Sequence, residues 1–94
     1  MYTILFSLEN NRLMCRRGNA LFRVQHLNNI PGMHVEFSTG ETLVQPTFYK
    51  DSCGYLQARG DDPATGLFVT VEIASALRAG TPICMVVIPP LRLV

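Results

Sequence analysis

The strongest constraint on the fold of this chain is a strict alternation of residue types from Leu67 to Ile73. Apolar Leu67, Val69, Val71 and Ile73 alternate with Phe68, Thr70 and Glu72. A repeat of two gathers the apolar residues on one face only when the segment is a β-strand. Residues 74–79 break the alternation, Gly80-Thr81-Pro82 turns the chain, and Ile83–Ile88 is apolar up to Pro89. The last third of the sequence therefore predicts two strands separated by a bend.

The first third of the sequence shows the same alternation of residue types in shorter segments. Tyr2–Leu8 alternates, and Asn10-Asn11 predicts a hairpin turn because asparagine tolerates a positive φ. Arg12–Arg17 is then the return strand, and Gly18-Asn19 forms a second turn. Ala20–Leu27 fits either a strand or a short helix. Its short length and its position between two turn signals favour a strand.

The middle of the chain predicts further short strands joined by turns. Residues 28–32 form a loop that ends in a Pro-Gly turn, and Met33–Phe37 alternates cleanly. Thr39-Gly40 leads into Glu41–Val44, and Pro46 confines the next segment to a sheet edge or a loop. The turn at residues 51–54 predicts a hairpin from Phe48 to Arg59, and residues 60–63 form the last polar loop.

These signals together predict a mainly β fold in a single domain that spans residues 1–94. Turn signals every eight to twelve residues are typical of a small barrel or sandwich. We expect about six to seven short, mostly antiparallel strands, with at most one or two short helical turns. A chain of 94 residues is long enough to bury one core without disulfides or metals.

Composition indicates the environment of the protein and suggests self-association. No apolar run approaches the roughly 20 residues of a membrane-spanning helix, so we expect no membrane partner. Three widely spaced cysteines fit neither a disulfide framework nor a zinc site, and they predict reduced thiols in the cytoplasm. Only 16% of the residues are charged, and the tail contains Leu91, Leu93 and Val94. This lean surface predicts a homo-oligomer.

Basic residues are concentrated near the N-terminus. The first 35 residues contain a single acid, Glu9, and four arginines, which are Arg12, Arg16, Arg17 and Arg23. The cluster suggests an anion site, although arginines on a solvated strand pair explain it equally well. The net charge is only +1 and the aromatic signature of RNA-binding domains is missing, which argues against a nucleic-acid partner. A nucleotide or other small anionic ligand fits the cluster better.

No arrangement of side chains in the sequence predicts catalysis. Cys15, His26 and His34 could in principle form a thiol–imidazole pair, but their spacing does not require it. His34 and Glu36 share a strand face, as an ordinary polar stripe would. The sequence also lacks a glycine-rich phosphate loop, a His-x-x-His pair and a nucleophile elbow. We therefore expect no enzyme activity, no catalytic residue, no bound metal and no cofactor.

Several fragments of the sequence resemble the PilZ domain. They are Asp61–Val69, Leu77–Thr81 and Val86–Pro89, together with Pro31–Phe37, which is similar to the strand that usually closes that barrel. Arg12 and Arg16 also have the Arg-x-x-x-Arg spacing with which PilZ domains hold cyclic di-guanylate. The sequence departs from the family pattern at Pro63, where the family has serine, and at His34, where it has glycine. The order of the fragments is also permuted.

The resemblance implies a ligand site and one specific strand pairing. Arg12, Arg16 and Arg17 would bind phosphates or guanine edges, and Asp61 would lie in the ligand loop. The apolar strand Ile83–Ile88 would pair with Ala20–Gln25, either within one chain or across a swapped dimer, so that Val86 lies beside Phe22 and Val24.

The sequence thus favours a non-enzymatic, PilZ-like β-barrel module that binds a phosphate-bearing nucleotide or a protein partner. A structural or accessory protein of viral or mobile-element origin, acting through homo-oligomeric contacts, is the alternative.

Overall fold

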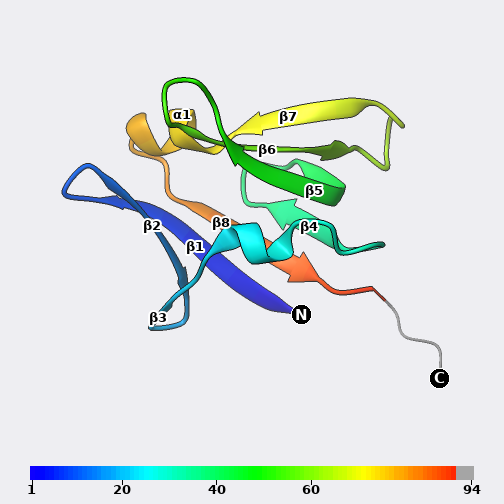
Figure 1. The fold of residues 1–94 in the computed structure, drawn as a ribbon, viewed down its shortest axis with the longest axis horizontal. Coiled ribbons are helices and arrows are strands. Elements are labelled where there is room, and N and C mark those ends of the chain that lie inside the picture. The colour runs from blue at the N-terminus through cyan, green and yellow to red at the C-terminus, as the bar shows by residue number, and fades with distance from the viewer. Residues whose placement is uncertain (91–94) are drawn as a thin grey trace.

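The structure is a computed structural model that describes residues 1–90, and it consists of one eight-stranded sheet with two short helical segments (Figure 1). The strands are β1 (Tyr2–Glu9), β2 (Arg12–Arg17), β3 (Ala20–Leu21), β4 (His34–Phe37), β5 (Thr42–Lys50), β6 (Leu56–Asp61), β7 (Phe68–Glu72) and β8 (Ile83–Ile88). The helical segments are the 3-10 turn η1 (Val24–Leu27) and the helix α1 (Ile73–Arg78). The apolar tail residues Leu91, Leu93 and Val94 lie outside the described residues.

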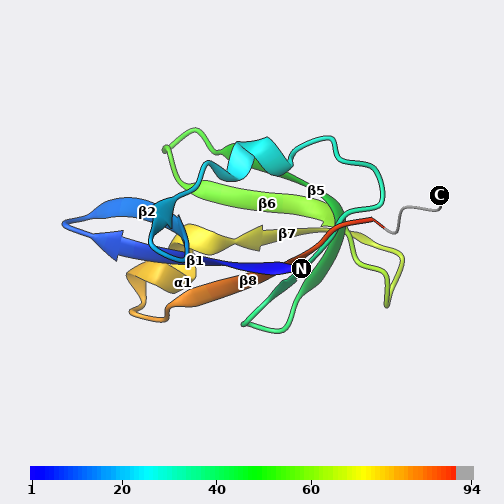
Figure 2. The ribbon, with the colours of Figure 1, turned by 90° about the horizontal axis from the view of Figure 1, so that it is seen from below.

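The strands follow the order β3-β2-β1-β8-β4-β5-β6-β7, and every paired neighbour is antiparallel. The sheet curls over itself, so that β5, β6 and β7 lie across from β1 and β8 (Figures 1 and 2). Its two terminal strands, β3 and β7, each have one neighbour within the described residues. The predicted mainly β fold is confirmed, as an open, curled sheet with eight strands rather than six or seven.

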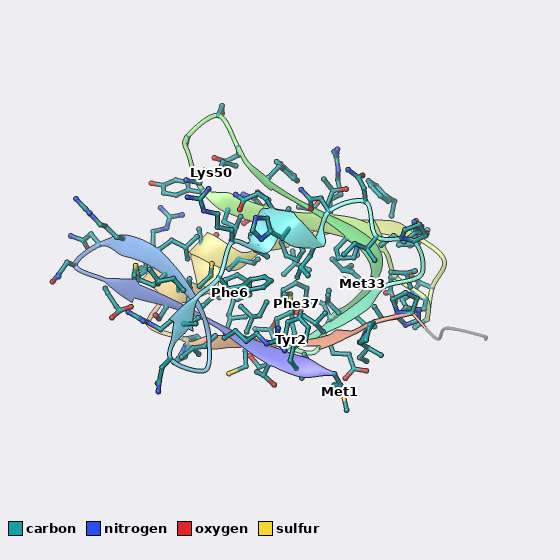
Figure 3. The ribbon with its side chains drawn as sticks, turned by 60° about the horizontal axis from the view of Figure 1, so that its bottom comes forward. Met1, Tyr2, Phe6, Met33, Phe37 and Lys50 are labelled. Carbon is teal, nitrogen blue, oxygen red and sulfur yellow. The ribbon has the colours of Figure 1, made fainter. Side chains whose placement is uncertain are left out.

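The core lies between the two layers of the curled sheet, where Figure 3 shows Phe6 and Phe37. Alternate residues of β1, β4 and β8 point inward, and Ile4, Val35 and Met85 are completely buried. Phe48 of β5 packs into the same cluster from the opposite layer. Because a single cluster holds residues from both ends of the chain, the two layers share one hydrophobic core.

The predicted hairpin turn that depends on asparagine is confirmed. Asn10 and Asn11 adopt φ values of 52° and 61° between β1 and β2. The short polar side chain of asparagine makes it one of the few residues that accept this left-handed region. The hairpin places Leu13 opposite Leu8 and Cys15 opposite Phe6. This register turns the apolar side of β2 toward the core.

The predicted strand Ala20–Leu27 is wrong over most of its length. Only Ala20 and Leu21 pair as β3, and the chain then forms η1 from Val24 to Leu27. Val24 and Leu27 are both buried. They are three residues apart, a spacing that brings them to one side of a helical turn but to opposite sides of a strand. Burial of this pair therefore explains the helical conformation.

The predicted pairing of Ile83–Ile88 with Ala20–Gln25 is also wrong. β8 lies between β1 and β4, with Val86 opposite both Thr3 and Glu36. These two neighbours satisfy the backbone groups on both edges of β8. Phe22 instead contacts Tyr2 edge to face, with a distance of 6.1 Å between ring centroids.

Pro46 marks the point where one edge of β5 loses its strand neighbour. β4 pairs with β5 only from Thr42 to Val44, and the β5–β6 register shifts between Val44 and Thr47. From Thr47 onward β6 is the one strand neighbour of β5 among the described residues, so the predicted edge position is confirmed. The side-chain amide of Asn28 covers this edge. Its Nδ2 donates to the Phe48 carbonyl at 3.1 Å, and its Oδ1 accepts from the Phe48 N–H at 2.7 Å.

Replacing Asn28 with alanine should remove both of these bonds and leave the buried backbone of Phe48 without partners. We expect a loss of about 1–3 kcal/mol in the free energy of unfolding, measured by urea denaturation. The matched control is Gln25→Ala, an exposed position in the neighbouring turn, which should change the stability by less than about 0.5 kcal/mol. Equal stabilities for the two variants would contradict this role of Asn28.

Candidate functional site

A cavity of about 680 Å³ lies between β2, the segment around η1 and the turn that joins β5 to β6. Apolar side chains from several elements form its walls. They are Leu13 on β2, Phe22 just before η1, Val24 in η1, and Leu56 at the start of β6. The cavity exists because β2 pairs with β3 only at Arg16 and Arg17. The edge of β2 from Arg12 to Met14 is left beside open space.

The charged residues that line the cavity are all basic. They are Arg12 on β2, Arg23 just before η1, and Lys50 at the end of β5. No acidic residue is among the described residues that form its walls. Figure 3 shows Lys50 on the layer opposite β2. Cations from three separate segments therefore border one partly apolar cavity, an arrangement that favours an anionic ligand.

The β5–β6 turn that follows Lys50 is held by the carboxylate of Asp51. The N–H groups of Cys53 and Tyr55 donate to Asp51 Oδ1 at 2.9 and 3.0 Å, and Gln57 Nε2 donates to Oδ2 at 2.9 Å. The pKa of Asp51 is lowered, mainly because its carboxylate accepts the hydrogen bond from the Tyr55 N–H. The charged carboxylate thus positions the hairpin end that carries Lys50 and Leu56.

Cys15 contributes a neutral thiol to the cavity. Burial raises its pKa to about 11, and the nearby charge of Lys50 only partly opposes this effect. A nucleophilic cysteine needs a lowered pKa, because the thiolate is the reactive form. This environment favours a thiol that packs against a ligand over one that attacks it. Cys15, Cys53 and Cys84 are all free.

Of the four residues that the sequence singled out as ligand-binding, the cavity contains Arg12. Arg16 forms an ion pair with Glu9, with Nη2 and Oε2 3.3 Å apart. The guanidinium of Arg17 lies 3.8 Å from the centre of the Tyr2 ring. Asp61 is exposed at the end of β6 and does not line the cavity. Of these four residues, Arg12 therefore lines the cavity, and Arg16, Arg17 and Asp61 do not.

Sequence reasoning missed Lys50 as a site residue, and it included Arg23 in the basic cluster but not among the four ligand-binding residues. Arg23 belongs to the basic N-terminal cluster, but the sequence pattern around it favours a strand and hides its place beside η1. Lys50 is the only lysine of the chain, and it lies in a segment predicted to be one side of a hairpin. Its place near the end of a predicted hairpin strand was the signal that could have identified Lys50. A hairpin pattern, however, does not reveal which surface the side chain faces.

The remaining candidates from the sequence are dispersed. His34 and Glu36 are exposed on one face of β4, as predicted, while Val35 and Phe37 point into the core. Within residues 1–90, no three His, Cys, Asp or Glu side chains lie close enough to hold a metal ion. In the same range, no helix has both the length and the apolar character needed to cross a bilayer.

Comparison of the chain with protein-family models, with curated proteins and with solved structures finds no match.

The raised pKa of Cys15 predicts a loss of stability at alkaline pH. An unfolded thiol ionises near pH 9.0, whereas the folded thiol stays neutral until about pH 11. The contribution of Cys15 is therefore complete below pH 9 and decreases as the pH rises toward 11. Urea denaturation should show that wild type loses more stability than Cys15→Ala over this range. Parallel pH profiles for the two proteins would contradict the prediction.

Proposed function

We propose that this protein is a non-enzymatic binding module whose cavity accepts a small phosphate-bearing ligand of the nucleotide class. The observation that carries the proposal is that Arg12, Arg23 and Lys50 converge on one cavity without an acidic neighbour among the described residues of its walls. A group of cations on one cavity favours an anion, and guanidinium groups bind phosphate oxygens through paired hydrogen bonds.

The size and the walls of the cavity support a ligand with an apolar or aromatic body. Small-molecule sites commonly enclose about 300–1,000 Å³ and combine apolar walls with a few polar groups. The volume of about 680 Å³ falls within that range. Leu13, Phe22 and Leu56 supply apolar surface for a base, while the three cations border the same space. A bare inorganic anion would leave this apolar surface unused.

Cyclic di-guanylate is the first nucleotide to test because it combines guanine bases with phosphates, although the strand pairing that the PilZ resemblance implies is not present within residues 1–90. Arg12 belongs both to the PilZ-like arginine motif and to the cavity wall. Arg16, Arg17 and Asp61 have no part in the proposed site. The neutral thiol of Cys15 favours binding over covalent chemistry. We also propose a cytoplasmic location, because all three cysteines are free thiols.

Isothermal titration with cyclic di-guanylate, guanosine monophosphate and inorganic phosphate tests the proposal. We expect a nucleotide to bind more tightly than phosphate, and Arg12→Ala/Lys50→Ala to weaken that binding at least about tenfold. The matched control is Arg16→Ala/Arg17→Ala, which removes the same charge from outside the cavity and should weaken binding only slightly.

Two outcomes would overturn the proposed site. One is the absence of binding to any of the three probes at millimolar concentration. The other is an equal loss of affinity in both double variants, which would indicate a general attraction to positive charge rather than binding in the cavity.

A structural or accessory role through contacts between copies of the chain is the second candidate. It is favoured by β7, which lies at the end of the sheet with one edge unpaired within residues 1–90 and carries the exposed side chain of Phe68. Unpaired strand edges are sites at which protein chains associate.

A further inference from the structure

The free edge of β7 presents a regular set of backbone hydrogen-bonding groups. Within residues 1–90, β7 pairs with β6 on one side only, and Figure 1 shows it along the margin of the sheet. The N–H of Asp62 donates to the Leu67 carbonyl at 2.8 Å. Bonding direction alternates along an antiparallel strand, so Val69 and Val71 bond toward β6. Phe68, Thr70 and Glu72 therefore direct their N–H and C=O groups to the open side.

This set of groups matches itself in antiparallel orientation. A two-fold axis beside Thr70 places Thr70 opposite Thr70 of a second copy, and Phe68 opposite Glu72 in both directions. Each of these three pairs can exchange two backbone hydrogen bonds. The register uses every outward-facing group of the strand.

The side chains near this edge are also complementary. Phe68 and Glu72 lie on the outer face of β7, and Arg59 of β6 places its guanidinium 5.3 Å from the Phe68 ring centre. Since Glu72 of the second copy would lie opposite Phe68, its carboxylate would come within reach of Arg59. Among residues 1–90, neither Arg59 nor Glu72 has an ion-pair partner in the single chain. Because of the two-fold symmetry, the dimer contains two such attractions between Arg59 and Glu72.

The other open edge of the sheet lacks such complementarity. The uncovered part of β2 begins at Arg12, whereas the stretch that contains Arg16 and Arg17 is covered by β3. An antiparallel contact between two uncovered β2 edges would bring the Arg12 side chains of both copies near each other. Like charges across neighbouring strands repel. This edge is therefore disfavoured for self-association, and it borders the cavity instead.

We propose that β7 pairs with β7 of a second copy of this chain, in the register centred on Thr70, and extends the sheet across the dimer. The inference deepens the second candidate function and does not depend on ligand binding in the cavity. A five-residue edge with Phe68 exposed at 63% forms a small interface. Small interfaces are typical of weak and reversible association. The dimer is therefore concentration-dependent.

Analytical ultracentrifugation from about 10 to 500 µM tests the association and its charge complementarity. We expect the average mass to rise with concentration. Glu72→Arg and Arg59→Glu should each weaken the dimer about fivefold, because each places like charges together. The double variant should recover association by exchanging the charges. Glu36→Arg, on the exposed face of β4, is the matched control and should dimerise like wild type. A single-chain mass at every concentration would overturn the proposal.

Disulfide cross-linking tests the register. In a Cys53→Ser/Cys84→Ser background, Thr70→Cys should form a cross-linked dimer under mild oxidation, because paired Cα atoms lie about 5.5 Å apart. Phe68→Cys should not cross-link, because position 68 of one copy faces position 72 of the other. Equal cross-linking at both positions, or cross-linking at position 68 alone, would overturn the register. The cavity double variant Arg12→Ala/Lys50→Ala should dimerise normally, which separates this test from that of ligand binding.

Discussion

The fold depends on the pairing of β8 along both of its edges. β8 comes from the end of the described chain, yet it lies between the N-terminal strand β1 and β4. Ile83, Met85 and Val87 are essentially buried, so the N–H and C=O groups of this strand need protein partners on both sides. This single strand joins the N-terminal hairpin to the meander from β4 to β7. Without it, the sheet would separate into two parts and the shared core would be lost.

The same strand order produces two terminal regions of the sheet with different properties. At one end, β3 covers only a short part of β2, and the remaining edge becomes the wall of a cavity with basic residues. At the other end, β7 has an open edge within residues 1–90, and Phe68 and Glu72 are exposed on it. Proteins commonly protect such edges with charge or with a covering segment. Here Arg12 places a repulsive charge on the uncovered edge of β2, whereas Glu72 of β7 and Arg59 beside it have opposite signs that suit a second copy.

The interior edge of β5 shows how a gap in the sheet is closed without another strand. After Pro46, β4 no longer accompanies β5, and the amide of Asn28 supplies both the donor and the acceptor that Phe48 requires. This contact anchors the segment after η1. Because Arg23 and Phe22 come just before η1, the contact also helps to define one wall of the cavity. The hydrogen bonds that complete the edge of β5 therefore also help to shape the proposed site.

The sequence alone determined the features that depend on local pattern. Alternation identified β1, β4 and β7, the asparagine pair identified the first turn, and Pro46 identified an edge. Segment 20–27 had patterns for both a strand and a helix, and burial of Val24 with Leu27 decided between them. The basic cluster was visible, but the ion pair with Glu9 and the Tyr2 ring divert Arg16 and Arg17 from the cavity. Only the tertiary structure brings Lys50 to Arg12, because side-chain position across layers depends on strand order and register, which local spacing does not encode.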